Sequence, residues 1–188
     1  VAETASTFAE MIVADASVRE AKSKEEKIAL LEDKIQRSVA FFMNIHARFL
    51  FETRFYEERK DGIVSANRLN ELMEEAQREA YGDALDTVHP HFWASKLHFY
   101  ITGVPFYNFP YTFGYLFSLS IYSKAKEEGS GFEEKYIALL QDTAVMSVED
   151  LAMKHLQEDI TKEAFWKKGI DLCIQDVEEF LQLTNTKG

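Results

Sequence analysis

The sequence predicts an all-α fold, and three observations lead to that prediction. Glycine and proline, which interrupt helices, are scarce: the 188 residues contain 8 glycines and 3 prolines. Apolar residues recur at spacings of three and four along most of the chain. The alternating pattern of half-buried strands is nearly absent. Because no internal repeat or long linker divides the chain, residues 1–188 are predicted to form a single domain.

The first part of the chain is predicted to form one short and one long helix. The short helix covers residues 3–16, and its apolar stripe consists of Phe8, Met11 and Ile12. The long helix follows Ser23, which forms a capping-box pattern with Glu26, and continues to about residue 59. Its apolar positions alternate at spacings of three and four: Ile28, Leu31, Ile35, Val39, Phe42, Ile45 and Phe49.

Five further helices are predicted along the rest of the chain. The first starts near Ser65 and ends at Gly82, a residue suited to a helix C-terminus. The other four are expected near residues 110–126, 132–141, 147–156 and 162–183. The last helix is expected to turn five apolar side chains toward the core: Phe165, Ile170, Ile174, Val177 and Leu181.

The acidic composition excludes two classes of partner. The formal net charge is −11, from 32 acidic and 21 basic residues. A nucleic-acid-binding surface needs a basic stripe to meet the phosphates, and anionic lipid also attracts basic residues. The chain has no run of 18 apolar residues that could span a membrane. We therefore expect neither nucleic acid nor a membrane as a partner.

The single cysteine, Cys173, indicates a reducing compartment, because one thiol cannot form an internal disulfide. No basic and apolar leader opens the sequence, so we expect a cytoplasmic protein. The apolar residues around Cys173 have helical spacing, which favours a packed small side chain over a nucleophile. The sequence does not begin with Met and starts inside a predicted helix, from which we expect a fragment of a longer protein.

Two carboxylates share one face of the first predicted helix. Glu3, Ser6, Thr7 and Glu10 align there, because steps of three, four and seven stay on one side of a helix. The surrounding residues are small and apolar, and a buried carboxylate requires a cation, a metal or several hydrogen bonds. The alternative is an ordinary helix start, where the positive end of the dipole favours acidic residues. The pattern alone leaves both open.

Residues 89–117 differ in composition from the rest of the chain. This segment holds all three prolines, three of the five histidines and eleven aromatic residues. Tyr107, Tyr111 and Tyr115 repeat every four residues, so a helix would align their hydroxyls in one stripe. Neutral tyrosine hydroxyls can donate to a developing oxyanion, but they can also belong to a core in which they bond locally.

Metal-ligand spacing gives no complete site. His89 and His91 could hold a metal but have no acidic or cysteine partner nearby in the sequence. His46 and His155 each stand alone on predicted helices, which indicates packed or surface residues. The chain contains neither His-Glu-x-x-His nor Glu-x-x-His, so a di-metal helical bundle lacks its ligands.

Four segments, however, resemble the oligoendopeptidase F family, a branch of the thimet-oligopeptidase-like zinc peptidases. They are residues 3–10 (ETASTFAE), 89–93 (HPHFW), 98–100 (HFY) and 106–115 (FYNFPYTFGY). The resemblance covers essentially the whole chain and is most specific in the first ten residues and in residues 89–117. It implies the multi-helix C-terminal portion of a zincin-type, predominantly helical oligopeptidase catalytic domain.

The resemblance also implies roles for individual residues. Glu3 corresponds to the third zinc ligand, and Glu10 to a neighbour that supports it. In the family, the other two ligands and the general base that activates water come from a His-Glu-x-x-His helix. His98 corresponds to a residue against the substrate or the tetrahedral intermediate. Tyr111 and Tyr115, and after them Tyr107, are the candidates for hydrogen bonds to the oxyanion.

The sequence departs from the family in one important respect, since both histidine ligands and the general base are absent from all 188 residues. A lone glutamate does not retain zinc, so we expect this chain alone to hold no zinc and to cleave no peptide. The implied partners are short peptide substrates and the N-terminal remainder of the same polypeptide. The alternative is a non-catalytic helical interaction or scaffold domain, which would not need Glu3, His98 or the tyrosines.

Overall fold

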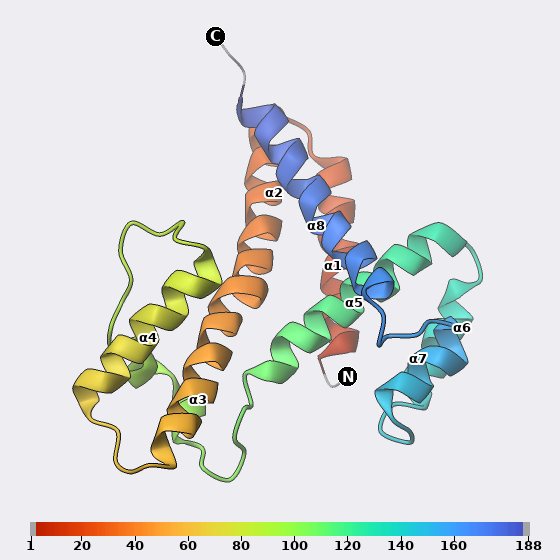
Figure 1. The fold of residues 1–188 in the computed structure, drawn as a ribbon. Coiled ribbons are helices and arrows are strands. Elements are labelled where there is room, and N and C mark those ends of the chain that lie inside the picture. The colour runs from red at the N-terminus through yellow and green to blue at the C-terminus, as the bar shows by residue number, and fades with distance from the viewer. Residues whose placement is uncertain (1–2, 186–188) are drawn as a thin grey trace. The chain divides into compact units, whose positions relative to one another are not determined.

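The structure, a computed structural model, describes residues 3–185 and confirms the all-α prediction, because these residues form helices and no strand. In chain order the helices are α1 (Thr4–Glu20), α2 (Lys24–Val39), η1 (Ala40–Asn44), α3 (Ile45–Arg59), α4 (Ala66–Tyr81), η2 (Phe92–Ser95), η3 (Leu97–Tyr100), α5 (Phe109–Glu128), α6 (Phe132–Gln141), α7 (Val148–Leu156) and α8 (Glu163–Thr184) (Figure 1). Helix η1 is a π-helix, and η2 and η3 are short 3-10 helices.

The predicted ends of two helices are confirmed by their capping contacts. The Ser65 hydroxyl accepts a hydrogen bond from the backbone N–H of Arg68 at 3.2 Å, which fixes the start of α4. Gly82 ends the same helix with a left-handed φ of 58°. Before α2, the Ser23 hydroxyl accepts from the N–H of Glu26 at 3.1 Å.

The long helix predicted to continue to residue 59 is interrupted by the π-helix η1. A π-helix inserts an extra residue into one turn and commonly bends the ladder of backbone hydrogen bonds. The Thr112 hydroxyl donates to the carbonyl oxygen of Phe41 at 2.7 Å and so occupies an acceptor within η1. This contact comes from a residue 71 positions away, which helical periodicity could not predict.

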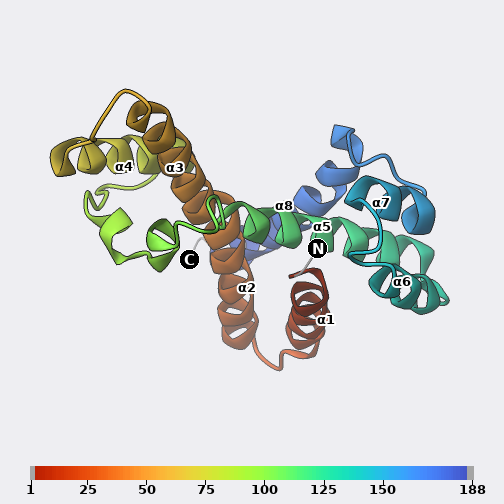
Figure 2. The same ribbon diagram turned by 90° about the horizontal axis from the view of Figure 1, so that it is seen from below.

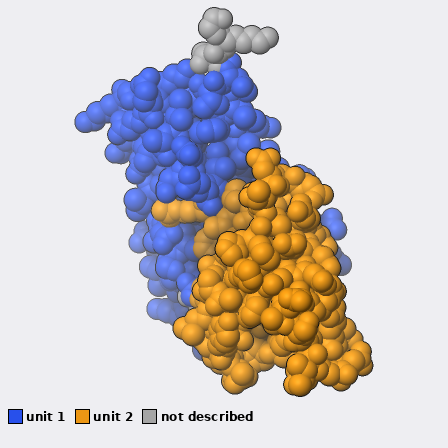
Figure 3. Space-filling view, turned by 90° about the vertical axis from the view of Figure 1, so that its left-hand side faces the viewer, with its two compact units in different colours: residues 1–36, 113–188 blue, residues 37–112 orange. Residues whose placement is uncertain are grey.

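The chain divides into two compact units (Figure 3). Unit 1 comprises residues 1–36 and 113–188, and unit 2 comprises residues 37–112. Helices α2 and α5 contribute residues to both units. The organisation of the chain as one domain stays a prediction.

In unit 1, two glycines bring α1 and α8 close to α5 (Figure 1). A Cβ atom at Gly114 of α5 would lie 3.1 Å from the Cβ of Glu3. A Cβ atom at Gly169 of α8 would lie 2.8 Å from the hydroxyl oxygen of Ser120 on α5. An alanine would therefore require a neighbouring atom to shift at Gly169, whereas at Gly114 it would make a contact that is tighter than usual. Helices α6 and α7 lie side by side in the same unit (Figure 2).

Lys34 of α2 links α1 and α8 of unit 1 through two carboxylates. Its Nζ atom lies 2.5 Å from Oδ1 of Asp15 and 2.7 Å from Oδ1 of Asp176. The Tyr122 hydroxyl of α5 donates to Oδ2 of Asp15 at 2.7 Å. Burial raises the pKa of Asp15, but hydrogen bonds from Lys34 and Tyr122 outweigh it, so the pKa lies below its ordinary value. At Asp176 burial prevails and raises the pKa.

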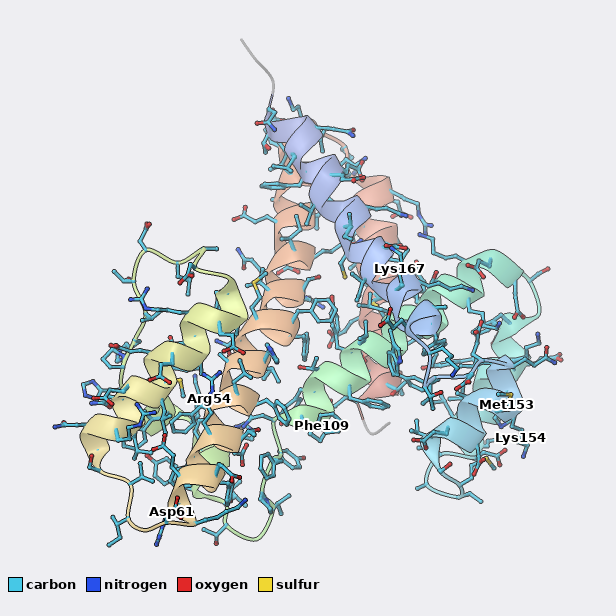
Figure 4. All side chains as sticks on the ribbon, viewed as in Figure 1. Arg54, Asp61, Phe109, Met153, Lys154 and Lys167 are labelled. Carbon is cyan, nitrogen blue, oxygen red and sulfur yellow. The ribbon has the colours of Figure 1, made fainter. Side chains whose placement is uncertain are left out.

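Unit 2 is built around helices α3 and α4, which pack against each other. Arg54 of α3, labelled in Figure 4, forms an ion pair with Glu79 of α4. The buried Gln77 amide holds the segment after α4, because it accepts from the N–H of His89 at 3.2 Å and donates to its carbonyl at 3.0 Å. The core consists of Phe51, Leu72, Met73 and Ala76, with Leu50, Val64, Leu69, Phe92, Trp93 and Phe99 packed against it.

The prediction for the buried face of α8 is right for Phe165 and wrong for the other four residues. Phe165 is buried, whereas the following side chains are exposed: Ile170, Ile174, Val177 and Leu181. Within the described residues α8 packs through Phe165, Gly169 and Cys173, which are spaced four apart, because the small residues allow the close approach to α5. No helix in residues 3–185 combines the length and the apolar character needed to cross a membrane.

Candidate functional site

Glu3, the predicted zinc ligand, caps the start of α1 through its backbone. Its carbonyl oxygen accepts hydrogen bonds from the N–H of Thr7 at 3.1 Å and from the hydroxyl of Ser6 at 3.2 Å. The Thr7 hydroxyl donates to the same oxygen. All three bonds involve the backbone carbonyl of Glu3 and none involves its carboxylate; as a residue, Glu3 is half-buried.

Helix α5 holds the first turn of α1 through small and hydroxyl side chains. Gly114 leaves room for Glu3, and the Ser118 hydroxyl donates to the carbonyl of Thr4 at 2.9 Å. The hydroxyl oxygens of Ser118 and Thr7 lie 2.7 Å apart. Glu10, on the same helix, is exposed to solvent. The two residues that the sequence placed on one face therefore differ in exposure, since Glu3 is half-buried next to Gly114 of α5 and Glu10 is exposed.

Tyr115 follows Gly114 on α5 and is buried in unit 1. Its hydroxyl lies 3.9 Å from the sulfur of Cys173 on α8. Cys173 is buried, so its prediction as a packed small side chain is confirmed. A thiol is a weak hydrogen-bonding group, so the contact between the Tyr115 hydroxyl and the Cys173 sulfur is a weak one.

Three further candidates form an aromatic cluster in unit 2. The imidazole of His98 stacks on the ring of Tyr107, with centroids 5.8 Å apart and planes 14° from parallel. The ring of Tyr111 meets both at its edge, at 5.7 Å from His98 and 5.8 Å from Tyr107. Nε2 of His98 lies 3.3 Å from the Tyr111 hydroxyl. The sequence segments 98–100 and 106–115 thus meet at these three side chains.

The predicted stripe of three tyrosines on one helix is only partly present. Helix α5 begins at Phe109, which is labelled in Figure 4, so Tyr107 lies in the preceding turn. Tyr111 and Tyr115 do share the helix at a spacing of four residues. The three side chains differ in exposure: Tyr107 is exposed, Tyr111 is half-buried and Tyr115 is buried.

Sequence reasoning missed Arg48 and gave no role to Asn108, although both lie near this cluster in unit 2. Asn108 is fully buried, and its Oδ1 accepts from Nη1 of Arg48 at 3.4 Å. The Arg48 guanidinium also lies 5.5 Å from the ring centroid of Phe92. Burial lowers the pKa of Arg48, against the opposing effects of Tyr81 and Tyr111. In the sequence, Arg48 looks like a surface residue of a long helix, because the residues that it meets, Asn108 and Phe92, are distant along the chain.

The other histidines do not gather into a metal site. His89 and His91 have ring centroids 5.9 Å apart, and Nδ1 of His89 accepts from the N–H of His91 at 3.1 Å. His155 pairs with Asp142 at 2.7 Å, and His46 is exposed. Residues 3–185 contain no group of three or more His, Cys, Asp or Glu arranged to hold a metal. Glu3 is a single donor, so the described residues do not by themselves fit a zinc ion.

The comparison with protein families identifies the class of this all-α chain, which is that of the metallopeptidases. The chain belongs to peptidase family M3, whose family model matches residues 1–171. No curated protein and no solved structure matches the chain. The resemblance to thimet-oligopeptidase-like peptidases is thereby confirmed at the level of the family, and the oligoendopeptidase F branch stays a prediction.

Proposed function

We propose that these residues are the helical C-terminal part of a zinc-dependent oligoendopeptidase, which hydrolyses internal bonds of short peptides. The observation that carries the proposal is the close approach of Glu3 to Gly114. It links the proposed zinc ligand to helix α5, where Tyr115 follows at the next position. Membership of peptidase family M3 supports peptide cleavage as the activity.

On this proposal the zinc ion is held jointly by Glu3 and by two histidines that lie outside these 188 residues. Catalytic zinc sites generally use three protein ligands and keep a further position open. The His-Glu-x-x-His motif that would complete the set belongs to a longer polypeptide of which this chain is the C-terminal part. The single cysteine of these residues supports a cytoplasmic location, because reducing compartments keep thiols unpaired.

The residues of the aromatic cluster would face the peptide. His98 is proposed to lie against the substrate or the tetrahedral intermediate, and its 3.3 Å contact with the Tyr111 hydroxyl supports a fixed orientation of the ring. Tyr111 and Tyr115 are proposed as hydrogen-bond donors to the oxyanion, with Tyr107 after them. A neutral phenol can stabilise developing negative charge without carrying a charge of its own. Glu10 is proposed to support the zinc site from the surface of α1.

The proposal is tested by comparing the longer polypeptide with the 188-residue chain in a peptide-cleavage assay that contains zinc. The longer polypeptide is expected to cleave a short internally quenched peptide, and a chelator is expected to stop it. The 188-residue chain is expected to show no cleavage under the same conditions, because it lacks the His-Glu-x-x-His motif. Zinc-dependent cleavage by the 188-residue chain would contradict the proposal.

A non-catalytic helical interaction domain is the second candidate function. The observation that favours it is the exposed apolar row on α8, which includes Ile170 and Ile174. The N-terminal remainder of the same polypeptide could cover this row in either case. The assay of the longer polypeptide discriminates between the two, because an intact longer chain that cleaves no peptide would favour the interaction function.

A further inference from the structure

Unit 2 contains a cavity of about 170 Å³ between α3, α4, η2 and η3. Six aromatic side chains, Leu69 and one charged residue, Glu52, form its walls. Phe51 is buried at 3% exposure, whereas Tyr56 and Tyr100 are 38% and 54% exposed. The cavity therefore extends from the core of unit 2 to the solvent beside these two tyrosines.

Glu52 is an unusual residue for such a wall, because its side chain is almost completely buried, at 4% exposure. One carboxylate oxygen, Oε1, accepts a hydrogen bond from the backbone N–H of Phe106 at 2.7 Å. The other oxygen, Oε2, is buried and has no hydrogen-bond partner among the described residues. A buried carboxylate with an unsatisfied oxygen is costly unless a cation or further donors meet it.

The turn at Phe106 explains the position of only one of the two carboxylate oxygens of Glu52, which is Oε1. Phe106 has a φ of 57°, a left-handed conformation that is strained for an aromatic residue, and the bond to Oε1 helps to hold it. A neutral glutamine could accept the same hydrogen bond. The negative charge and the second oxygen are therefore in excess of what the turn requires.

We propose that this cavity binds the ammonium group of a lysine side chain. Aromatic ring faces attract organic cations, and a carboxylate supplies the charged acceptor that an ammonium needs. A guanidinium prefers two acceptor oxygens side by side, and Oε1 is already engaged by Phe106. The volume equals that of about six water molecules at roughly 30 Å³ each, which suits an alkylammonium chain.

The position of the cavity along the chain indicates that the lysine belongs to a peptide substrate, and this step rests on the proposed function. Helix η3 contributes Phe99 and Tyr100 to the cavity wall. The residue before them on the same short helix is His98, the proposed substrate contact. A peptide that contacts His98 would therefore pass close to the cavity wall. The cavity would then select a lysine at one position of that peptide.

The direct test titrates the 188-residue chain with Nα-acetyl-lysine amide and with Nα-acetyl-norleucine amide, which has a similar apolar chain but no ammonium group. Binding is followed through the indole N–H resonance of Trp93, a wall residue that donates to Asn70 at 2.9 Å. We expect the lysine amide to bind about 10-fold more tightly or better, as a charged hydrogen bond and ring contacts imply. Nα-acetyl-arginine amide is expected to bind more weakly than the lysine amide.

Three variants separate the ligand site from the structural role of Glu52. Glu52→Gln retains an acceptor for Phe106 and removes the charge, so the preference for lysine over norleucine is expected to disappear. Tyr100→Ala changes only the exposed rim and is expected to weaken lysine binding while leaving the buried turn intact. Glu57→Gln, an exposed carboxylate on the same helix, is the matched control and is expected to bind the lysine amide as the wild type does.

Equal binding of the lysine and norleucine amides would overturn the proposal, as would lysine binding by Glu52→Gln at wild-type affinity. A preference for arginine would overturn the choice of an ammonium group. These measurements need neither zinc nor cleavage. They therefore show whether the cavity binds an ammonium group even if the proposed peptidase function fails. In the longer polypeptide, Glu52→Gln is expected to lower the ratio of kcat/KM for a lysine peptide over a norleucine peptide by about 10-fold. An unchanged ratio would overturn the assignment of the lysine to the substrate.

Discussion

Gly114 of α5 lies so close to Glu3, the residue that precedes α1, that a Cβ atom at Gly114 would be 3.1 Å from the Cβ of Glu3. The contact continues along α5, where the Ser118 hydroxyl donates to the carbonyl of Thr4 at 2.9 Å. Helix α5 thus positions the first turn of α1 through residues that have little or no side chain. Any substitution that widens this contact is expected to move the Glu3 carboxylate.

Alanine at Gly114 and alanine at Gly169 are expected to destabilise the chain to different extents. A Cβ atom at Gly169 would lie 2.8 Å from the Ser120 hydroxyl and 3.0 Å from the Ser120 backbone nitrogen. Overpacking of this kind costs about 1–3 kcal/mol. The higher helix propensity of alanine offsets about 1 kcal/mol of this destabilisation. At Gly114 the contact is longer, so Gly114→Ala is expected to lower the free energy of unfolding less than Gly169→Ala.

The measurement for this series is urea unfolding followed by circular dichroism. Gly103→Ala is the matched control, because no atom lies within 4 Å of a Cβ at Gly103, and it is expected to leave the free energy of unfolding nearly unchanged. A larger loss at Gly114 than at Gly169 would contradict the packing described for α5.

In the longer polypeptide, His98→Ala and Tyr111→Phe are each expected to lower kcat by about 100-fold, the size typical of losing a donor to an oxyanion. The two side chains are in contact at 3.3 Å, so their effects are expected to be less than additive in the double variant. Zinc content should not change. His46→Ala, an exposed histidine on α3, is the control. Wild-type kcat in both single variants would rule out the proposed roles.

Tyr115→Phe tests the buried tyrosine of α5 in a different way. Its hydroxyl contacts the sulfur of Cys173 at 3.9 Å, and loss of such a weak contact is expected to change stability by less than about 1 kcal/mol. A fall in kcat of about 100-fold without a matching loss of stability would therefore report a role in the reaction. Cys173→Ala serves as the control and is expected to retain activity. If Tyr115→Phe keeps wild-type kcat, the assignment of Tyr115 is wrong.

Tyr122→Phe is expected to destabilise unit 1 by about 1–3 kcal/mol at neutral pH, because the lost hydroxyl donates to the charged Asp15. Burial, together with that hydrogen bond, raises the pKa of Tyr122 above its ordinary value of 10.0. As the pH rises above 10, Tyr122 therefore ionises in the unfolded chain before it ionises in the folded chain. This ionisation stabilises the unfolded wild type and lowers its free energy of unfolding, whereas the variant has no hydroxyl at this position to ionise. The difference in unfolding free energy between the two proteins should shrink above pH 10. A difference that grows there would contradict the assignment.

Most helix boundaries could be predicted from the sequence because local residues set them. Ser65 and Gly82 bound α4 through a hydroxyl acceptor and a left-handed backbone, and both signals are visible in the sequence. The π-helix at residues 40–44 has no such signal. Its acceptor at Phe41 is met by Thr112, and a contact over that distance depends on the whole of unit 2.

The candidate site was predicted in part. Glu3, His98 and the tyrosines could be found by resemblance, and the structure brings His98, Tyr107 and Tyr111 together. Glu52 could not be found, because a glutamate in the middle of a long helix is typical of an exposed position. Its burial depends on the turn at Phe106 and on rings from η2 and η3. The buried face of α8 was mispredicted for a similar reason, since periodicity identifies an apolar row but not the surface that covers it.

The zinc content of the longer polypeptide tests the central claim most directly, since it asks whether Glu3 is a zinc ligand. Purified wild-type protein and the Glu3→Gln variant are compared by elemental analysis after dialysis, with Glu25→Gln, an exposed glutamate of α2, as the control. We expect about one zinc ion per molecule in the wild type and the control, and loss of zinc from Glu3→Gln, because two histidines alone do not complete the ligand set. Full retention of zinc by Glu3→Gln would contradict the account.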